Sequence, residues 1–291
     1  MGIDVTNNKE GVLSYPRLTM APTVDYVFTR DYLDNNRINL MHSFWTKVFG
    51  YTVHPKIPTN QPDLRVADVG TGTGIWLLDA RDTFAPSAQL EGFDISFNAT
   101  PPAGVIPSNV KFRHWDVNTD LPPDLDGVFD IVHVRFLSFV LLNDDAPAVV
   151  KKLFKMLKPG GYLQWGEADM ETLRFEKCGI DAQTESLTEL FKLLEIQDPR
   201  LKPTWAKGLP DLFTAAGFID IEVDKNDCPP HWAFAFHECG LMIHELIYRK
   251  TKNVKMQDEL GRLLPKAVEE TRNGAYGTSI RVTVIGKKPQ A

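Results

Sequence analysis

The chain has 291 residues, 43% of them hydrophobic and 24% charged, a globular composition that indicates neither wholesale disorder nor a membrane protein. Lysine and arginine total 32 against 38 for aspartate and glutamate, and the net charge of -6 argues against a protein that binds nucleic-acid phosphates. No run of about 18 apolar residues predicts a transmembrane helix, and the polar first ten residues lack a signal-peptide pattern, so we expect a cytoplasmic protein.

The N-terminal part of the chain predicts one long helix, from about residue 24 to Gly50. An apolar stripe recurs at helical spacing along it, formed by Ile38, Met41, Trp45, Val48 and Phe49. Three prolines between residues 51 and 62 then separate this helix from the rest of the chain. We therefore expect an N-terminal helical segment over residues 1–56.

From Pro62 onward, short apolar runs alternate with helical stretches, a pattern typical of a parallel sheet with crossover helices. The predicted strands are Leu64–Val69, Gln89–Ile95, Val110–Trp115, Phe129–Val134, Gly161–Trp165, Phe218–Val223 and Ile280–Val284. Helices are predicted at Ala148–Leu157, Leu187–Leu194 and Leu209–Ala216.

The last two predicted strands are separated by residues 231–275, a stretch too long for a loop in a compact fold. We interpret it as an inserted helical segment. The core then comprises residues 57–230, and residues 276–291 supply its final strand.

Residues 66–76 read VADVGTGTGIW, a pattern typical of a buried strand, a glycine-rich turn and the start of a helix. Glycines let a backbone turn tightly and come close to a ligand. A dinucleotide fingerprint needs GxGxxG, whereas this turn is GxGxG with Asp68 two positions before the first glycine. A pyrophosphate disfavours a nearby carboxylate, but S-adenosylmethionine has no phosphate and carries an ammonium group that Asp68 can hold.

Two more acids follow at the ends of the next predicted strands. Asp94 ends the second strand, where such folds place an acid on the ribose hydroxyls. Asp116 closes the third, where it can accept a hydrogen bond from the adenine amino group, with Trp115 or Val117 beside the ring. Each acid alone is equally well explained as a turn or capping residue, but three at successive strand ends are less easily explained by chance.

The sequence resembles the class I S-adenosylmethionine-dependent methyltransferases from about Leu64 to Asp169, with a looser continuation to the end. The resemblance rests on VADVGTGTGIW (66–76), GFDIS (92–96), RHWDV (113–117), FDIVHVRFL (129–137) and LKPGGYLQWGEAD (157–169). It is nearest to the UmtA and LaeA-like type of fungal secondary metabolism. The resemblance implies an α/β, Rossmann-like sheet of seven strands with helices on both faces, the last strand antiparallel, and S-adenosylmethionine across the carboxyl ends of the first strands.

The resemblance also implies roles for individual residues. The methionine part of the cofactor lies against Asp68, Gly70, Gly72 and Gly74, the ribose against Asp94, and the adenine against Asp116 with Trp115 or Val117. One departure is Met41, which stands in the helix RINLMH (37–42) where the family often reads RLDLQH. If that glutamine contacts the cofactor or the substrate in relatives, the contact is missing here. The Asp/Asn-Pro-Pro-Tyr motif of enzymes that methylate nucleobases or glutamine is absent after the fourth strand, which disfavours those substrates.

Methyl transfer from a sulfonium is an in-line displacement, so the protein must align the acceptor and remove its proton where there is one. His133, at the end of the fourth predicted strand, is the candidate base, because a neutral imidazole accepts a proton near neutral pH. The alternative is that His133 only caps a helix or binds a backbone carbonyl. Candidate substrate contacts come from the strand ends and the aromatic-rich helical segments: His42, Trp45, Arg135, Glu167 and Trp232.

No metal site is expected. The three cysteines, Cys178, Cys228 and Cys239, are odd in number and form no CxxC pair. His237 and His244 lie seven residues apart and are explained more simply as part of an ordinary helix face than as ligands.

We therefore expect a methyltransferase acting on oxygen or nitrogen of a small-molecule natural product, with residues 24–50 and 231–275 as a cap over the acceptor. In the alternative for residues 24–50, they pack on the back of the sheet. Two other functions stay open: a cofactor-binding regulatory protein of the LaeA-like kind, and a protein that uses the same pocket for a pericyclic step. Neither a nucleic acid nor a membrane is an expected partner, and the oligomeric state is left open.

Overall fold

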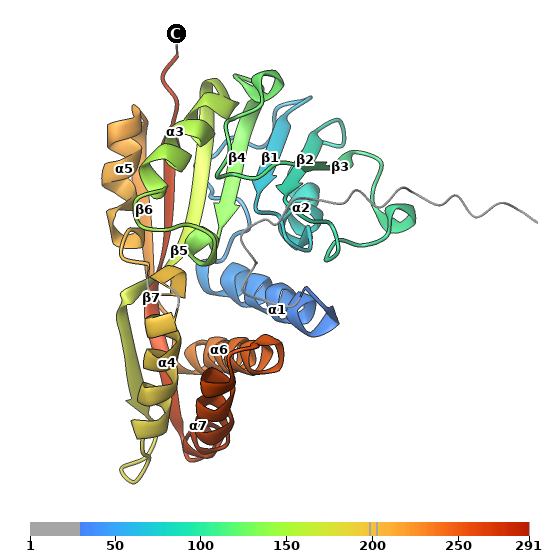
Figure 1. Ribbon diagram of the computed structural model, residues 1–291. Helices are drawn as coiled ribbons and strands as arrows, with labels where there is room; N and C mark the ends of the chain where they lie inside the picture. The colour runs from blue at the N-terminus through green and yellow to red at the C-terminus, as the bar shows by residue number, and fades with distance from the viewer. Residues whose placement is uncertain (1–29, 198, 202, 291) are drawn as a thin grey trace, which may run out of the picture.

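The computed structural model describes residues 30–197, 199–201 and 203–290, which form a seven-stranded sheet in the order β3-β2-β1-β4-β5-β7-β6 (Figure 1). The strands are β1 (Arg65–Val69), β2 (Gln89–Asp94), β3 (Val110–His114), β4 (Phe129–Arg135), β5 (Leu157–Lys177), β6 (Ile219–Asp227) and β7 (Ala275–Lys287). Strands β1 to β5 are all parallel to one another, and β7 is antiparallel to both of its neighbours, β5 and β6. The predicted sheet with an antiparallel last strand is confirmed.

The order of the parallel strands determines where a ligand can lie. The chain runs outward from β1 to β2 and β3, and then returns to place β4 on the other side of β1. In open α/β sheets, ligands bind outside the carboxyl ends of the strands at such a reversal. The ends of β1, β2, β3 and β4 therefore share one edge.

Helices cover both faces of the sheet. They are α1 (Tyr32–Phe49), α2 (Ile75–Ala80), α3 (Ala146–Met156), α4 (Glu185–Gln197), α5 (Leu209–Ala216), α6 (Pro230–Lys250) and α7 (Val254–Arg272). Side chains alternate along β1, so that Val66 packs with α2 on one face while Ala67 and Val69 pack with α3 and α5 on the other. The two faces thus have separate apolar cores, as the predicted strand–helix alternation requires.

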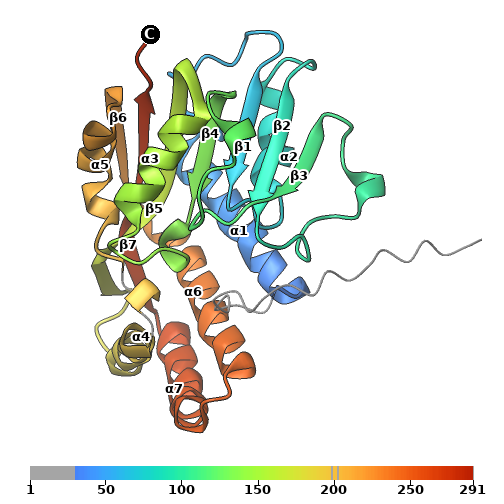
Figure 2. The same cartoon turned by 45° about the horizontal axis from the view of Figure 1, so that its top comes forward.

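Beyond the carboxyl edge, α4, α6 and α7 pack together beside an extension of β5 and β7 (Figure 2). The helices predicted within residues 231–275 are confirmed as α6 and α7. The fifth strand was predicted only as Gly161–Trp165, and that length is wrong: β5 runs on to Lys177 because its second half pairs with the start of β7. The pairing joins Lys177 to Ala275 across about a hundred residues of sequence, so no local pattern indicates it.

Helix α1 is shorter than the helix predicted from about residue 24. It begins after Asp31, whose side chain accepts hydrogen bonds from the N–H groups of Leu33 and Asp34, and it ends at Gly50 in the left-handed region (φ +78°). Residues 24–29 lie outside the described part of the chain. Aromatic side chains join α1 to α6: the Phe44 ring lies 5.7 Å from that of Trp232 and 5.5 Å from that of Phe236.

Across the described residues, none of the helices combines the length and the apolar character that a membrane crossing demands.

Candidate functional site

The glycine-rich turn lies between β1 and α2, at the carboxyl edge of the sheet. Gly70, Gly72 and Gly74 all have positive φ, at +72°, +57° and +76°. The N–H groups of Gly70 and Thr71 donate to the carbonyl oxygen of Phe93 at 2.8 and 3.0 Å, which ties the turn to β2. An added Cβ on Gly72 meets no atom closer than 3.9 Å, so its backbone faces open space. The turn leaves room for close approach by a ligand there.

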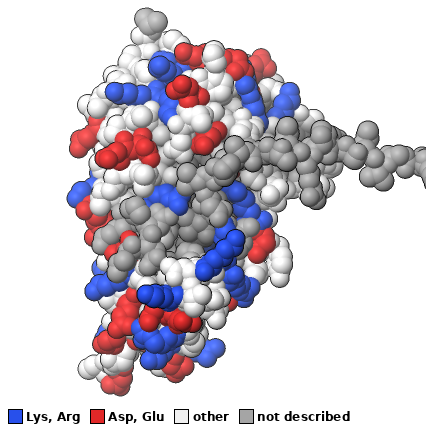
Figure 3. Space-filling model, viewed as in Figure 1, with Lys and Arg blue, Asp and Glu red and all other residues white. Residues whose placement is uncertain are grey.

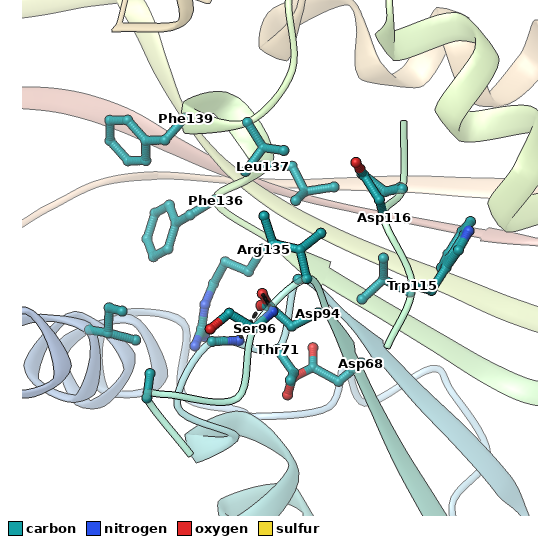
Figure 4. A pocket seen from close by; sticks show the side chains of 18 of the residues that line it. Asp68, Thr71, Asp94, Ser96, Trp115, Asp116, Arg135, Phe136, Leu137 and Phe139 are labelled. Carbon is teal, nitrogen blue, oxygen red and sulfur yellow. Dashed lines mark hydrogen bonds between the residues drawn. The ribbon is translucent and has the colours of Figure 1, made fainter. Parts of the chain in front are cut away.

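Asp94, the last residue of β2, points at this turn (Figure 4). Its Oδ2 accepts a hydrogen bond from the Gly72 N–H at 2.9 Å, and its Oδ1 accepts one from the Ser96 N–H at 3.2 Å. Burial raises the pKa of the Asp94 carboxyl, and these backbone donors oppose the rise. Each carboxylate oxygen keeps a further lone pair for a ligand.

The residues predicted after the third strand follow β3 directly. Asp116 is partly exposed, and its Oδ1 accepts a hydrogen bond from the Asn118 N–H at 2.9 Å. Trp115 is buried; its indole N–H donates to the Asp120 carbonyl oxygen at 3.1 Å and its ring packs edge-on against Phe93. The Trp115 ring thus belongs to the core below the cavity.

Asp68 and His133 lie opposite each other in the register of β1 and β4 and face the same side of the sheet. His133 Nδ1 lies 2.7 Å from Asp68 Oδ1, and Thr71 donates to Asp68 Oδ2 at 2.6 Å. The ring of Trp76 stacks on the His133 imidazole at 3.8 Å between centres. Burial lowers the pKa of His133 although Asp68 raises it, so the neutral ring donates from Nδ1 to Asp68 and carries its lone pair on Nε2.

Arg135 ends β4 on the same side of the sheet. Its Nη2 donates to His42 Nδ1 at 2.7 Å, and His42 Nε2 lies 3.0 Å from Asp79 Oδ2. Burial, and to a lesser degree Arg135, lower the pKa of His42 to about 4, so this histidine is neutral. Burial also lowers the pKa of Arg135 to about 10, which leaves it protonated at neutral pH.

These residues surround one cavity of about 560 Å³ at the carboxyl edge (Figure 4). The predicted site residues that line it are Asp68, Gly70, Gly72, Asp94, Trp115, Asp116, Val117, His133 and Arg135. Helix α1 adds four lining residues: Asp34, Arg37, Ile38 and Met41. In the described part of the chain, α6 and α7 contribute no lining residue.

Five predicted site residues lie outside this lining. Gly74 packs against β3, because an added Cβ there comes within 2.7 Å of the Phe112 ring. His42 contacts Arg135 from behind, and Trp45 stacks on Phe49 within the aromatic contacts between α1 and α6. Trp232 belongs to the same aromatic group.

Glu167, the fifth residue outside the lining, is fully buried behind the turn that follows β4. The Trp165 indole N–H donates to Glu167 Oε1 at 2.9 Å. Burial raises the pKa of the Glu167 carboxyl to about 7. Glu167 therefore stabilises the turn at Leu137 and Ser138, and Leu137 lines the cavity.

Sequence reasoning missed the charged pair on α1. Asp34 and Arg37 are both buried, and Asp34 Oδ1 accepts from Arg37 Nη2 at 2.7 Å and from Nε at 2.9 Å. Asp34 Oδ2 is buried with no hydrogen-bond partner among the described residues. The sequence pattern that could have predicted this pair is two opposite charges three residues apart, on the same helix face as Ile38 and Met41.

No group of three or more histidine, cysteine, aspartate or glutamate side chains that could hold a metal ion occurs within residues 30–197, 199–201 and 203–290.

Comparison with known proteins finds a matching family and several similar proteins. A model of the family described as "Methyltransferase domain" matches residues 41–223. The N-methyltransferase verN of Clonostachys rogersoniana is 32% identical over 139 residues, 48% of each chain, and the N-methyltransferase gliN of Aspergillus fumigatus is 30% identical over 55% of this chain and 57% of its own. The secondary metabolism regulator LAE1 of Hypocrea atroviridis is 28% identical over 70% of this chain and 58% of its own.

The chain spans about half the length of the curated relatives it matches. Among solved structures, the cyclopropane synthase MmaA2 from Mycobacterium tuberculosis has a TM-score of 0.50 at 14% identity, covering 85% of this chain and 84% of its own. That likeness agrees with the fold predicted from the glycine-rich turn and the alternation of strands with helices.

Proposed function

The chain belongs to the methyltransferase domain family, and on that premise we propose that it binds S-adenosylmethionine and transfers its methyl group to nitrogen or oxygen of a small-molecule acceptor. The observation that carries the proposal is the convergence of Asp68, Asp94 and Asp116 with the Gly72 backbone on one cavity. These groups come from three neighbouring strand ends, so the sheet itself fixes their spacing.

The residues present fit this cofactor. Asp94 offers free lone pairs to the two ribose hydroxyls, and Asp116 offers a carboxylate to the adenine amino group. The open backbone at Gly72 accommodates the thioether chain, and Asp68 lies beside the place of the ammonium group. When bound, S-adenosylmethionine supplies an electrophilic methyl on its sulfonium.

For the acceptor, the protein must hold the attacking atom in line with the methyl group and remove its proton where it has one. We propose His133 for this proton, accepted on Nε2. Asp68 fixes the tautomer through Nδ1, and Trp76 fixes the plane of the ring. The neutral imidazole is the form that accepts a proton, and burial favours that form.

A nitrogen acceptor has two supports. The relatives verN, tcpN and gliN are named N-methyltransferases. In this chain the buried Asp34 Oδ2 lacks a partner at the cavity among the described residues, and a carboxylate oxygen of that kind suits an amine on a ligand.

On the face shown in Figure 3, basic and acidic side chains are interspersed, a distribution that suits a small molecule better than a nucleic-acid backbone.

The second candidate function is a cofactor-binding regulatory protein, and the similarity to LAE1 over 70% of the chain favours it. Both functions need the cofactor site, so methyl transfer is what separates them. The experiment supplies S-adenosylmethionine with a labelled methyl group and a panel of small amines and phenols, and follows the mass of each acceptor. Our proposal expects a gain of one methyl with the parent protein and none with His133→Gln on an acceptor that must lose a proton. Tight cofactor binding with no methylated product across the panel supports the regulatory function.

A further inference from the structure

Arg135 carries a charge that the surrounding protein does not balance. Its guanidinium lines the cavity at the end of β4 (Figure 4), yet it makes no ion pair with a carboxylate of the described residues. Its hydrogen bond goes to His42, and its other contacts are the ring faces of Trp45 and Phe136, with centres 5.7 and 5.6 Å away. An arginine stays protonated and has five N–H donors, so most of its donors remain for a ligand.

The acids nearest to Arg135 make no ion pair with it. Asp68 accepts from Thr71 and His133. Glu167 accepts from the Trp165 indole on Oε1; its Oε2 has no hydrogen-bond partner among the described residues, but Glu167 is fully buried outside the cavity lining. Asp79 binds His42 and also accepts from the Thr52 hydroxyl at 2.8 Å. They influence Arg135 only at longer range. Arg135 is of intermediate exposure, and charges largely withdrawn from water in proteins are normally paired, so we assign the partner position to a ligand that enters the cavity.

His42 orients this guanidinium. Because an arginine can only donate, His42 Nδ1 must accept, and the ring proton lies on Nε2, where it is donated to Asp79. His42 is nearly fully buried, whereas the Asp79 side chain is 45% exposed. The pair therefore fixes one edge of the guanidinium, and neither His42 nor Asp79 lines the cavity that Arg135 lines.

We propose that Arg135 binds a carboxylate of a ligand in the cavity, held in place by His42 and Asp79. This inference rests on the proposed function and extends it to the charge of the ligand. Two sources share the chemistry: the amino-acid end of the cofactor, and a carboxylate on the acceptor. A guanidinium with several donors directed at one position matches the two oxygens of a carboxylate in either case.

The experiment measures three ligands by calorimetry on the full chain. S-adenosylhomocysteine carries the carboxylate, 5′-methylthioadenosine has the same nucleoside and thioether without it, and benzoate is a carboxylate small enough for the acceptor end. The variants are Arg135→Gln and Arg135→Lys, with Arg113→Gln as the matched control, since Arg113 pairs with Asp124 at the surface and does not line the cavity. Should Arg135→Gln fail to fold, Arg135→Lys keeps the charge and loses only the paired geometry.

With the cofactor as source, the Arg135 variants bind S-adenosylhomocysteine at least about tenfold more weakly and bind 5′-methylthioadenosine as the parent does. With the acceptor as source, both nucleosides bind unchanged, and binding of benzoate to the S-adenosylhomocysteine-loaded protein weakens by at least about tenfold. Equal losses for S-adenosylhomocysteine and 5′-methylthioadenosine, or no change in any ligand, overturn the inference. If the parent binds neither nucleoside, the proposed function fails, and benzoate binding to the unloaded protein still decides the role of Arg135.

Discussion

At the end of the cavity formed by β2 and β3, each acid is held by backbone N–H groups close to it in the sequence or in the adjoining glycine turn, as Asp94 and Asp116 show. At the end formed by β4 and α1, the contacts join side chains far apart in the chain: Arg135 and His42 are 93 residues apart, and Asp68 and His133 are 65 apart. The first end is therefore a property of strand ends and their turns. At the second end, the Arg135–His42 contact depends on how α1 is placed against the sheet, whereas Asp68 and His133 are brought together by the pairing of β1 with β4.

The largest expected effect tests the cofactor end. Gly72→Val places a branched side chain at φ +57° and fills the space above the turn, so we expect S-adenosylhomocysteine to bind more than about 1,000-fold more weakly. The control is Gly127→Val, because Gly127 has a φ of +67° and likewise leaves an added Cβ free of close contacts, but does not line the cavity. Both variants lose about 1–3 kcal/mol of stability from backbone strain. Calorimetry that finds equal affinities for the two variants contradicts the role of Gly72.

The second prediction concerns Glu167, the buried carboxyl behind the turn that follows β4. Its folded pKa of about 7 lies above the ordinary 4.5, so the native state holds this proton more tightly than the unfolded chain does. The contribution of Glu167 to the free energy of unfolding therefore falls as the pH rises from 4.5 to about 7, and stays low above that. The shift corresponds to about 3 kcal/mol.

We accordingly expect Glu167→Gln to flatten the decline of stability between pH 5 and pH 8 measured by urea unfolding at a series of pH values. The control is Glu176→Gln, which makes the same substitution at an exposed position on the same strand. A Glu167→Gln profile that runs parallel to that of the parent shows that the carboxyl ionises in the folded protein as it does in the unfolded chain.

Asp94→Ala tests the ribose contact with a smaller effect. Loss of a charged acceptor for two hydroxyls weakens S-adenosylhomocysteine binding by about 2 kcal/mol, or about 30-fold. Asp130→Ala is the matched control, because Asp130 also accepts a backbone N–H at a strand of this sheet, that of Arg65, but lies away from the cavity. Unchanged affinity in Asp94→Ala removes the ribose assignment and leaves Asp94 only as a support for the turn.

The difference between local contacts and contacts that join distant segments also explains which features the sequence predicts. The existence of the strands and the position of the acids follow from short patterns: each strand is an apolar run, and each acid stands directly at its end. The length of β5 and the network of Arg135, His42 and Asp79 depend on pairings between distant segments, which no window of sequence contains. His42 and Arg135 were each predicted as substrate contacts. Their contact with each other was not predicted, because it requires the angle at which α1 crosses the sheet.

The smallest expected effect concerns Met41, at the position where the family resemblance implies glutamine. Met41 lines the cavity, and its sulfur lies 3.2 Å from Arg37 Nη1, so the side chain at this position faces the ligand and a charged neighbour together. Met41→Gln offers an oxygen to Arg37 and an amide to the ligand at nearly constant volume, and we expect S-adenosylhomocysteine to bind up to about fivefold more tightly. Met41→Leu is the control, since it keeps the volume without polar atoms. If the two variants bind alike, the position acts through packing alone, and the departure of this chain from its relatives lies outside cofactor binding.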